Sequence, residues 1–548
     1  MYSNKENVNI LTALLVCHGI RTAVVCPGSR NAPIVHNLNE CPLITCYAVT
    51  DERSAGFYAL GMAQALATPV AVCVTSGTAL LNLAPAVAEA YYQHLPLIVI
   101  SADRPEAWIG QLDGQTIPQK DAFGRFVHKE VSLPEPQNND DRWLCNRLVN
   151  EALLASIHRG GGPVHINVPI GKPLFGFTMP ELPRHRVIKR IESVADTSAM
   201  GDVIRAFGHA LRPMIVIGQQ NRAAADACKE SLVELQSLLP VLYECLGMPS
   251  SSLLDLHIED ALDLIEGNEE AYLPDFVLYV GDALISNRLK EFLRKDRDME
   301  VWAVTSDGDI HDTFMAQTGV IEGKSWEVLN VIRTVLQSDK SICPDQEQKV
   351  FYERWKAVLD RAYIHAHNTV SSFSERGVLE RFFDELYLRT SIDYELQAGN
   401  SMAVRLVNEF AKEHVCCNRG VNGIEGSLST AAGMSVVLGR IVFCIIGDLS
   451  FFYDQNALWN GNLKGNLRVL LLNNGHGGIF DRLPHLDESA AKEPYIIGVH
   501  HTFAQGICMQ NNVAYLRADS YKQMDKALKT FMQPMTDRPI VLEIVLGR

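Results

Sequence analysis

The sequence predicts an α/β protein of three domains whose sheets are mainly parallel. Apolar runs of strand length alternate with segments of helix length along most of the 548 residues, which is typical of parallel strands joined by helical crossovers. Hydrophobic residues make up 47% of the chain, enough for several packed cores. Polar connectors near 184–189 and 338–349 separate a first domain (1–182), a central domain (190–340) and a third domain (350–548).

The first two domains show the alternation most regularly. Apolar residues at helical spacing predict a helix over residues 4–20. The predicted strands are 22–26, 44–49, 70–75 and 97–101 in the first domain, and 214–218, 241–243, 276–281 and 300–305 in the central domain. No GxGxxG motif follows a strand of the central domain, so a dinucleotide site is not predicted there.

The third domain contains the stretch with the strongest chemical signal, residues 447–474. Gly447 and Asp448 follow one apolar run of strand length, and Asn474 follows a second. Ligands bind at such carboxyl ends of parallel strands, and a carboxylate beside an amide oxygen suits a hard divalent cation. We therefore predict a metal-bridged diphosphate site. The alternative is an ordinary strand-helix-strand unit with an N-cap Asp and a turn-forming Asn-Asn-Gly.

A second acidic residue, Glu52, follows the second predicted strand. In one interpretation Thr50 or Asp51 caps a helix and Glu52 occupies its first turn, where an acid contributes about 0.3–1 kcal/mol. In the other, Glu52 lies in a dry pocket. Burial there stabilises the neutral carboxylic acid, which can share a proton with a ring nitrogen of a ligand.

Arginines also follow predicted strand ends. Arg30 and Arg104 do so in the first domain, and Arg405 and Arg419 lie in two segments of the third domain that contain Gly and Asn. A guanidinium offers a planar fork to a carboxylate, whereas an arginine that only pairs with a surface acid contributes little. The net charge of −15 disfavours a nucleic-acid-binding function, so an anionic ligand would have to be bound by such local arginines.

Cysteine usage and the N-terminus bear on location. The 13 cysteines form no CxxC pair or regular framework, and several lie inside apolar runs. The first residues lack the basic region and apolar segment of a cleavable signal peptide. No apolar run approaches the length of a membrane span. We predict a cytoplasmic protein with reduced thiols.

Together these motifs resemble one enzyme family. The Gly-Asp and Asn-Asn pairs are similar to the thiamine-diphosphate-binding signature. The more specific motifs resemble the 2-succinyl-5-enolpyruvyl-6-hydroxy-3-cyclohexene-1-carboxylate (SEPHCHC) synthases of menaquinone biosynthesis, the MenD family. These motifs are CPGSR at 26–30, TDERSAG at 50–56, TSGTA at 75–79, ADRP at 102–105, GNS at 399–401, NRG at 418–420 and GDLS at 447–450. The resemblance implies pyrimidine, central and diphosphate domains in that order.

The resemblance implies a transferase with two acidic substrates. 2-Oxoglutarate would lose carbon dioxide, and the succinyl carbanion equivalent would add to isochorismate in a 1,4 sense. Thiamine diphosphate and Mg²⁺ or Mn²⁺ would be the cofactors. Members of the family bind the two ends of the cofactor on different subunits, which implies a homodimer or a dimer of dimers (homotetramer).

The resemblance also implies residue roles. Glu52 would activate the cofactor, and further catalytic residues would be Ser401, Arg405, Arg419 and Gln115. The metal ligands would be Asp448, Asn474 and the carbonyl of His476. The remaining cofactor contacts would be Thr75, Asn400, Ser401, Ile424, Gly447, Leu449, Ser450 and Phe480. Substrates would contact Ser29, Arg30, Arg104, Gln115, Arg288, Arg405 and Arg419.

Some of these assignments have alternatives. Ile424 suits a core position equally well, and Asn287 replaces a lysine of the family beside Arg288. A different thiamine enzyme, such as an acetohydroxyacid synthase or a 2-oxo acid decarboxylase, is a rival that would be expected to use less acidic substrates. A catalytically silent diphosphate-binding protein of the same fold is a rival of another class. Glu52 disfavours that rival, because pure binding has no need of a neutral acid there.

Overall fold

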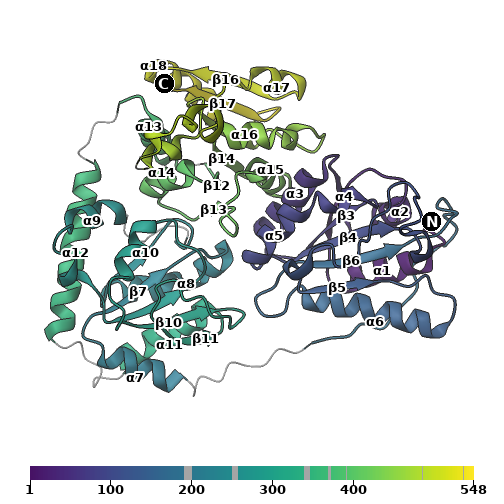
Figure 1. The fold of residues 1–548 in the computed structure, drawn as a ribbon, viewed down its shortest axis with the longest axis horizontal. Coiled ribbons are helices and arrows are strands. Elements are labelled where there is room, and N and C mark those ends of the chain that lie inside the picture. Colours follow the sequence, from purple (N-terminus) through teal and green to yellow (C-terminus); the bar gives the residue numbers. More distant parts are fainter. Residues whose placement is uncertain are drawn as a thin grey trace. The chain divides into compact units, whose positions relative to one another are not determined.

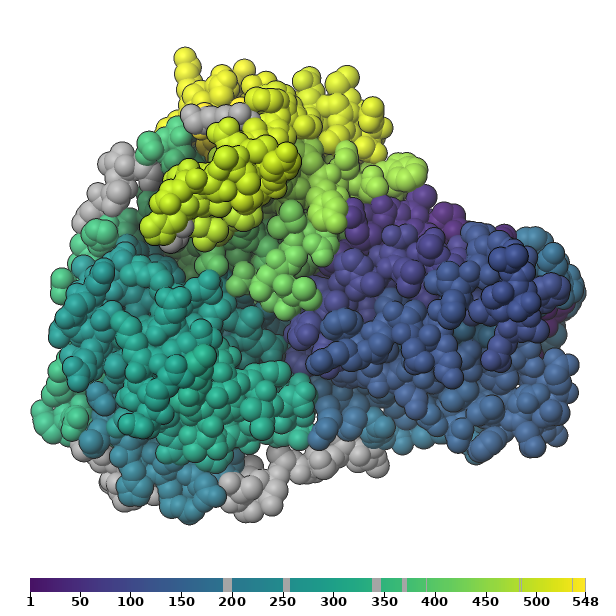
Figure 2. All heavy atoms as spheres, in the orientation of Figure 1, coloured from purple at the N-terminus to yellow at the C-terminus, as the bar shows by residue number. Residues whose placement is uncertain are grey.

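The computed structural model describes residues 1–190, 200–249, 257–338, 346–367, 372–390, 392–483, 485–534 and 536–547. Figure 1 labels the helices and strands, and Figure 2 shows all heavy atoms in the same view. The chain divides into two compact units, one of residues 1–191, 391–401 and 418–548, the other of residues 192–390 and 402–417. Among the described residues, no helix is both long and apolar enough to cross a membrane.

The first unit begins with a six-stranded sheet in the order β2-β1-β3-β4-β6-β5, with all neighbours parallel. Its strands are β1 (Thr22–Val25), β2 (Thr45–Ala48), β3 (Val70–Val74), β4 (Leu97–Asp103), β5 (Lys129–Ser132) and β6 (Val164–Pro169). Its helices are α1 (Glu6–Cys17), α2 (Ala32–Glu40), α3 (Glu52–Leu66), α4 (Thr78–Leu81), α5 (Ala84–Tyr92) and α6 (Asn139–Ala155). The strand order reverses between β1 and β3, so the loops that follow these strands flank a crevice of the type that binds ligands.

The same unit contains a second parallel sheet, in which β12, β14, β15, β17 and β16 lie in that order. These strands are β12 (Tyr394–Ala398), β14 (Ile441–Gly447), β15 (Leu467–Asn473), β16 (Ala514–Ala518) and β17 (Ile540–Val545). The associated helices are α15 (Ser427–Val437), α16 (Asp448–Tyr453), α17 (Gln505–Gln510) and α18 (Tyr521–Phe531). Strand β14 is buried along almost its whole length, because its apolar run faces packed elements on both sides.

The second unit has a five-stranded parallel sheet in the order β11-β10-β9-β7-β8. Its strands are β7 (Pro213–Ile217), β8 (Val241–Tyr243), β9 (Phe276–Val280), β10 (Glu300–Thr305) and β11 (Gln317–Glu322), and β13 (Val415–Cys417) also belongs to this unit. Its helices are α7 (Gly201–His209), α8 (Arg222–Leu235), α9 (Ile258–Leu264), α10 (Asn287–Leu293), α11 (Ser325–Ser338), α12 (Gln346–His367), α13 (Glu375–Tyr387) and α14 (Met402–Phe410).

The predicted fold class is confirmed. The strands predicted at 22–26, 70–75 and 300–305 match β1, β3 and β10 to within a residue, and the helix predicted at 4–20 is α1. The three sheets lie within residues 22–169, 213–322 and 394–545. The domain limits themselves stay a prediction.

Helices α3 and α15 of the first unit pack unusually closely through glycines. A Cβ on Gly61 of α3 would lie 2.1 Å from the carbonyl oxygen of Thr430, and a Cβ on Gly433 of α15 would lie 2.2 Å from that of Tyr58. Real Cβ atoms do not approach a backbone oxygen so closely, so neither position has room for a side chain. The contact matters for the site, because α3 begins at Glu52 and α15 follows the segment that contains Arg419.

We predict that Gly433→Ala lowers the stability of the protein. Alanine normally favours a helix interior over glycine by about 1 kcal/mol. Here the clash with the Tyr58 carbonyl should outweigh that gain, because overpacking of a close contact costs about 1–3 kcal/mol. Thermal unfolding measures the effect, and Gly506→Ala in α17 is the matched control, since nothing lies within 4 Å of a Cβ there. An equal or higher Tm for Gly433→Ala would contradict the packing argument.

Candidate active site

Asp448 and the turn after Asn474 meet at the carboxyl ends of two adjacent parallel strands. Asp448 follows β14 and Asn474 follows β15. The backbone N–H of Gly475 donates to Asp448 Oδ2 at 2.7 Å, and the N–H of Leu449 donates to Oδ1 at 2.6 Å. The Asp448 side chain is buried, and this burial raises its pKa, while the two N–H donors and His500, 3.2 Å away, oppose the rise.

The donor set at this corner fits a hard divalent cation. It offers a carboxylate, an amide side chain and the carbonyl of a turn, all of them oxygen ligands of the kind that Mg²⁺ and Mn²⁺ take. The turn is compact, because the N–H of His476 donates to Asn474 Oδ1 at 3.1 Å. Leu449 lies beside this corner and is partly buried, with Gly498 against its side chain, and Phe480 lies against Gly477 in the turn that follows.

A buried glutamate that the sequence analysis missed supports the same corner. Glu543 on β17 accepts hydrogen bonds from Asn473 Nδ2 at 2.6 Å and from the Tyr515 hydroxyl at 2.6 Å. Asn473 also donates to the carbonyl of Thr502 at 3.0 Å, so the residue before Asn474 is held from two directions. A single acid inside the apolar run 540–545 was the only sequence signal for this role.

Glu52 is the first residue of α3, and Asp51 is the helix cap, as one interpretation of the sequence predicted. Asp51 Oδ1 accepts the N–H of Ser54 at 3.1 Å, and its Oδ2 accepts the side-chain amide of Asn456 at 2.7 Å. Glu52 is half-buried. Burial raises its pKa, and the neighbouring Asp51 carboxylate raises it further, against a backbone N–H that lowers it. Both effects favour the neutral acid that the functional interpretation requires.

The loops after β1 and β3 touch each other and the segment that contains Gln115. A Cβ on Gly28 would lie 2.4 Å from Thr75 Cβ, and a Cβ on Gly77 would lie 3.3 Å from the carbonyl carbon of Gln115. Thr75 is buried, and Ser29 beside Gly28 is exposed. The structure therefore brings three of the predicted contacts to one rim of the first sheet.

Arg30 and Arg104 lie at the same rim. Arg30 is buried, and its guanidinium donates to the Ile170 carbonyl at 2.6 Å. Burial lowers the pKa of Arg30, and the nearby positive charge of Arg104 lowers it further. Arg104 is partly exposed, pairs with Asp113 at 2.8 Å and donates to the Gly114 carbonyl at 2.8 Å. Two neighbouring cations at a strand-end rim favour an anionic ligand.

Asn400, Ser401 and the segment 418–424 form the third part of the site. Asn400 is buried and its amide donates to the carbonyls of Asn418 and, at 2.7 Å, Gly423. Ser401 has a left-handed backbone (φ +70°), which turns the chain sharply after β12. Ile424 is 39% exposed, which contradicts the core alternative for this residue, and its carbonyl accepts the hydroxyl of Ser450.

Two further predicted residues belong to the second unit. Arg405 on α14 donates to the carbonyl of Ile285 at 3.0 Å. Arg288 on α10 is 44% exposed and pairs with Asp263 at 2.7 Å and with Glu259 at 3.6 Å. These partners are surface acids, so the contact that the structure gives Arg288 is a solvated ion-pair network.

Comparisons with known proteins agree with this geometry. Residues 6–124 match the N-terminal and residues 398–544 the C-terminal thiamine pyrophosphate-binding domain of thiamine pyrophosphate enzymes. A SEPHCHC synthase of Bacteroides thetaiotaomicron is 43% identical over 99% of this chain and 96% of its own length, and one of Porphyromonas gingivalis is 34% identical over 100% and 95%. The chain belongs to the SEPHCHC synthase family.

The fold comparison extends beyond this family. A crystal structure from Mycobacterium smegmatis, assigned to the thiamin diphosphate-dependent enzymes, aligns with a TM-score of 0.72 at 19% identity and covers 99% of this chain and 100% of its own. At that identity the likeness shows the fold alone. Membership of the SEPHCHC synthase family confirms the predictions of a thiamine-diphosphate enzyme of the transferase class.

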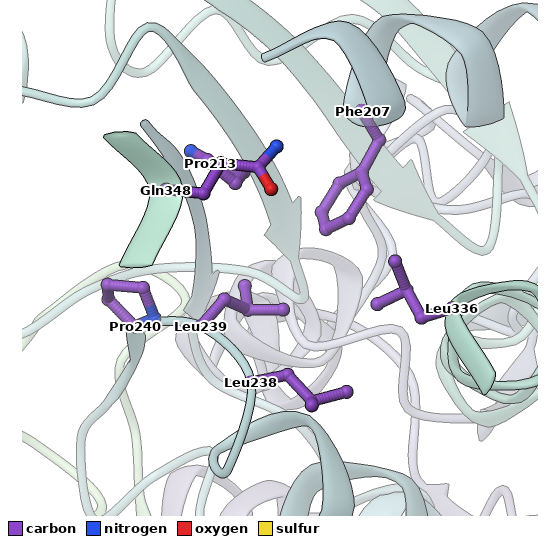
Figure 3. A pocket seen from close by; sticks show the side chains of 7 residues that line it. All are labelled: Phe207, Pro213, Leu238, Leu239, Pro240, Leu336 and Gln348. Atoms are coloured by element: carbon purple, nitrogen blue, oxygen red, sulfur yellow. The ribbon is translucent and has the colours of Figure 1, made fainter. Parts of the chain in front are cut away.

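The second unit contains an apolar pocket. Figure 3 shows the side chains that line it, which are Phe207, Pro213, Leu238, Leu239, Pro240, Leu336 and Gln348. None of them is charged, and the one polar side chain, Gln348, donates to the carbonyl of Ala210. No residue assigned from the SEPHCHC synthase motifs lines this pocket, so we do not assign it a part in the reaction.

Proposed function

We propose that this chain is a SEPHCHC synthase that decarboxylates 2-oxoglutarate and adds the remaining four-carbon unit to isochorismate in a 1,4 sense. The observation that carries the proposal is the 42–43% identity, over 99–100% of the chain, to relatives with that name. Thiamine diphosphate, when bound, supplies the carbanion chemistry for both steps. The chain's own residues bind and orient the substrates and place the protons.

The cofactor would be held at the two strand-end corners of the first unit. Asp448, Asn474 and the His476 carbonyl would hold Mg²⁺ or Mn²⁺, whose charge would offset that of the diphosphate. The all-oxygen donor set and the buried Asp448 carboxylate support this assignment. Thr75, Asn400, Ile424 and Ser450 would line the cofactor, together with Gly447, Leu449 and Phe480.

Glu52 would act on the aminopyrimidine end of the cofactor. Burial raises its pKa and so favours the protonated carboxyl, which could donate a proton to a ring nitrogen and recover it. Asp51 strengthens this effect by its charge and is itself fixed by Ser54 and Asn456. A neutral acid at this position would distinguish an active enzyme from a protein that only binds diphosphate.

The substrates would be recognised through their carboxylates. Ser29, Arg30, Arg104 and Gln115 would bind isochorismate at the rim of the first sheet, and the neighbouring positive charges of Arg30 and Arg104 support this. Ser401, Arg405 and Arg419 would surround the part derived from 2-oxoglutarate, with Ser401 assisting proton movement. We give Arg288 a lesser role, because its guanidinium already pairs with two acids.

The active enzyme would be a homodimer, with a dimer of dimers as the larger form. Within one chain, Asp51 contacts Asn456 and Arg53 contacts the Tyr453 carbonyl at 2.7 Å. Tyr453 is the last residue of α16 and Asn456 lies beyond it, whereas Asp448 is the first residue of that helix. These contacts join the start of α3 to the end of α16 within one chain, so the shared site, in which Glu52 of one subunit serves Asp448 of another, is proposed from the resemblance to the family. We place the enzyme in the cytoplasm, since the 12 cysteines of the described residues are free thiols.

The deciding experiment uses the purified protein with thiamine diphosphate, Mg²⁺, 2-oxoglutarate and isochorismate. We expect the coupled product by mass spectrometry, with one carbon dioxide released for each product molecule. Pyruvate in place of 2-oxoglutarate is the control for the rival thiamine enzymes and should give little product. Carbon dioxide release that does not respond to isochorismate, with no coupled product, would overturn the synthase assignment.

Arg30→Ala should impair the use of isochorismate more than the decarboxylation of 2-oxoglutarate. A lost hydrogen bond to a charged group costs about 1.5–3 kcal/mol, which corresponds to a rise of roughly 10- to 100-fold in the KM for isochorismate. The two half-reactions are measured separately, and Arg21→Ala is the control, because Arg21 precedes β1 whereas Arg30 follows it. Equal losses in both half-reactions would argue against the placement of Arg30.

A further inference from the structure

A buried glutamate of the first sheet's helices binds the backbone beside Arg419. Glu89 lies on α5 and is 3% exposed. Its Oε1 accepts the N–H of Gly420 and its Oε2 accepts the N–H of Val421, both at 2.7 Å, across more than 330 residues of sequence. Burial raises the pKa of Glu89, and these donors and the Gln93 amide oppose the rise by stabilising the carboxylate.

The contact leaves the backbone little freedom. A Cβ on Gly420 would lie 2.9 Å from Tyr92 Cβ and 3.0 Å from the Glu89 carbonyl, so the segment lies directly against α5. A carboxylate that binds two consecutive N–H groups fixes the two peptide planes that carry them, here the plane that joins Arg419 to Gly420 and the plane that joins Gly420 to Val421. Arg419 is the residue immediately before, and its side chain is buried. The direction of the Arg419 side chain therefore depends on a peptide plane whose orientation is fixed by hydrogen bonds to Glu89.

The other end of the segment is held separately. The Asn400 amide donates to the carbonyls of Asn418 and Gly423, and the Asn418 amide donates to the Thr430 hydroxyl at 3.0 Å. Asn400 thus binds carbonyls on one side of the segment, while Glu89 binds N–H groups on the other. An irregular segment loses about 1–2 kcal/mol of conformational freedom for each residue that is ordered, so such contacts are needed to keep it in one conformation.

The second unit contains a similar arrangement near Arg405, in which a buried glutamate accepts two consecutive backbone N–H groups. Glu244, which follows β8 and is 3% exposed, accepts the N–H groups of Ile285 and Ser286. The carbonyl of Ile285 in turn accepts the guanidinium of Arg405 at 3.0 Å. A buried glutamate thus binds two consecutive N–H groups near each arginine assigned to 2-oxoglutarate. Arg419 directly precedes one such pair, and Arg405 donates to a carbonyl of the other.

We propose that Glu89 is a positioning residue that aims Arg419 at a carboxylate of 2-oxoglutarate by fixing the backbone of residues 420 and 421. The inference rests on the proposed function, because it needs Arg419 to bind that substrate. Glutamine cannot replace Glu89, since an amide offers one acceptor oxygen and would turn its NH₂ group toward the second backbone donor.

The test compares Glu89→Gln with the wild type in the full reaction. We expect the KM for 2-oxoglutarate to rise by about 10- to 100-fold, as misplacement of a binding group by about 1 Å can do, while the KM for isochorismate stays within about twofold. Glu395→Gln is the matched control. That glutamate is also buried and bonded in the same unit, but it pairs with Arg440 near the start of β12. We expect a similar fall in Tm for both variants and a change in KM only for Glu89→Gln.

A double-mutant cycle separates positioning from general destabilisation. If Glu89 acts through Arg419, Glu89→Gln adds no further rise in the KM for 2-oxoglutarate when Arg419 is already alanine. An equal additional rise in that background overturns the inference, as does an unchanged KM in the single variant. Glu89→Asp, which keeps the charge and both oxygens, serves if Glu89→Gln does not fold and should show a smaller rise. A wild type that does not use 2-oxoglutarate would instead refute the proposed function, and this inference with it.

Discussion

Glu52→Gln should lower turnover by about 10²- to 10⁴-fold, the contribution expected of a positioned acid-base group, while thiamine diphosphate still binds. Glutamine fills the same space at the start of α3, so the helix and its Asp51 cap should persist. It cannot give up or recover a proton as Glu52 can, and burial and the Asp51 charge favour the protonated form of Glu52 by raising its pKa. Carbon dioxide release in a single turnover and calorimetric titration with the cofactor measure the two quantities separately.

The pH dependence gives this prediction a second test. The pKa of Glu52 is raised, so its neutral form persists to higher pH than that of an ordinary glutamate, and activity that needs the neutral acid falls as the pH rises through that raised pKa. The small residual activity of Glu52→Gln should lack this fall. Glu106→Gln, at an exposed acid of the same unit, is the control and should keep both the rate and the profile. Full activity in Glu52→Gln would remove Glu52 from its assigned role.

The buried strands could be predicted from sequence, because a continuous apolar run is sufficient to mark them. Strands β3 and β9 are buried at every position and were located to within a residue. Edge strands were harder. Strand β5 reads Lys-Glu-Val-Ser and β16 contains an exposed arginine, and each lies at the edge of its sheet, where one side lacks a neighbouring strand. Over four or five residues, these partly polar sequences show no clear alternation of apolar and polar residues, so they were not recognised as strands.

Strand β6 shows a different limit. It lies between two strands of the first sheet but contains the buried residues His165 and Asn167. The Ser101 hydroxyl lies 2.7 Å from His165 Nε2 and donates to Asn167 Oδ1 at 2.9 Å, and Gln119 also donates to Asn167 at 2.8 Å. These polar groups are satisfied only by partners on other elements, so the sequence of β6 alone did not reveal a buried strand.

The same distinction applies to the site. Asp448, Glu52 and Arg30 could be proposed as site residues because each stands within a few residues of the end of a predicted strand, where ligands commonly bind. Glu89 and Asn456 could not, because their partners lie 331 and 405 residues away along the chain. A residue that acts by fixing the position of a distant residue is not marked by any motif in its own stretch of sequence. Only the fold brings it to its partner.

Asp448→Asn should abolish most of the gain in thiamine diphosphate affinity that Mg²⁺ provides, so that the affinity measured with Mg²⁺ falls by at least about 100-fold. Residues that only orient a metal ligand commonly contribute about 10- to 100-fold to metal affinity, and a ligand itself should contribute no less. Both Asp448 oxygens already accept backbone N–H groups, so an amide would turn its NH₂ against Leu449 or Gly475 and offer the cation a neutral oxygen. Titration of the protein with thiamine diphosphate, with and without Mg²⁺, measures the effect. Chelation should bring the wild type to the affinity of the variant.

Asp454→Asn is a closely matched control for this change. Asp454 follows α16, is fully buried and accepts the N–H and the hydroxyl of Ser429 at 2.7 and 2.8 Å. Burial raises its pKa to about 7, so asparagine imitates the neutral form that is already populated near neutral pH. The control should therefore keep the Mg²⁺-dependent gain. Retention of that gain in Asp448→Asn as well would remove Asp448 from the metal ligands.

Mixing the two inactive variants tests the shared site directly. If Glu52 of one subunit serves Asp448 of the other, a heterodimer of Glu52→Gln and Asp448→Asn contains one site with both defects and one site with neither. Co-expression with two different affinity tags should then yield a heterodimer with about half the activity of the wild type, from the one intact site in two. If each chain instead completed its own site, every site in the heterodimer would carry one defect and no activity would return.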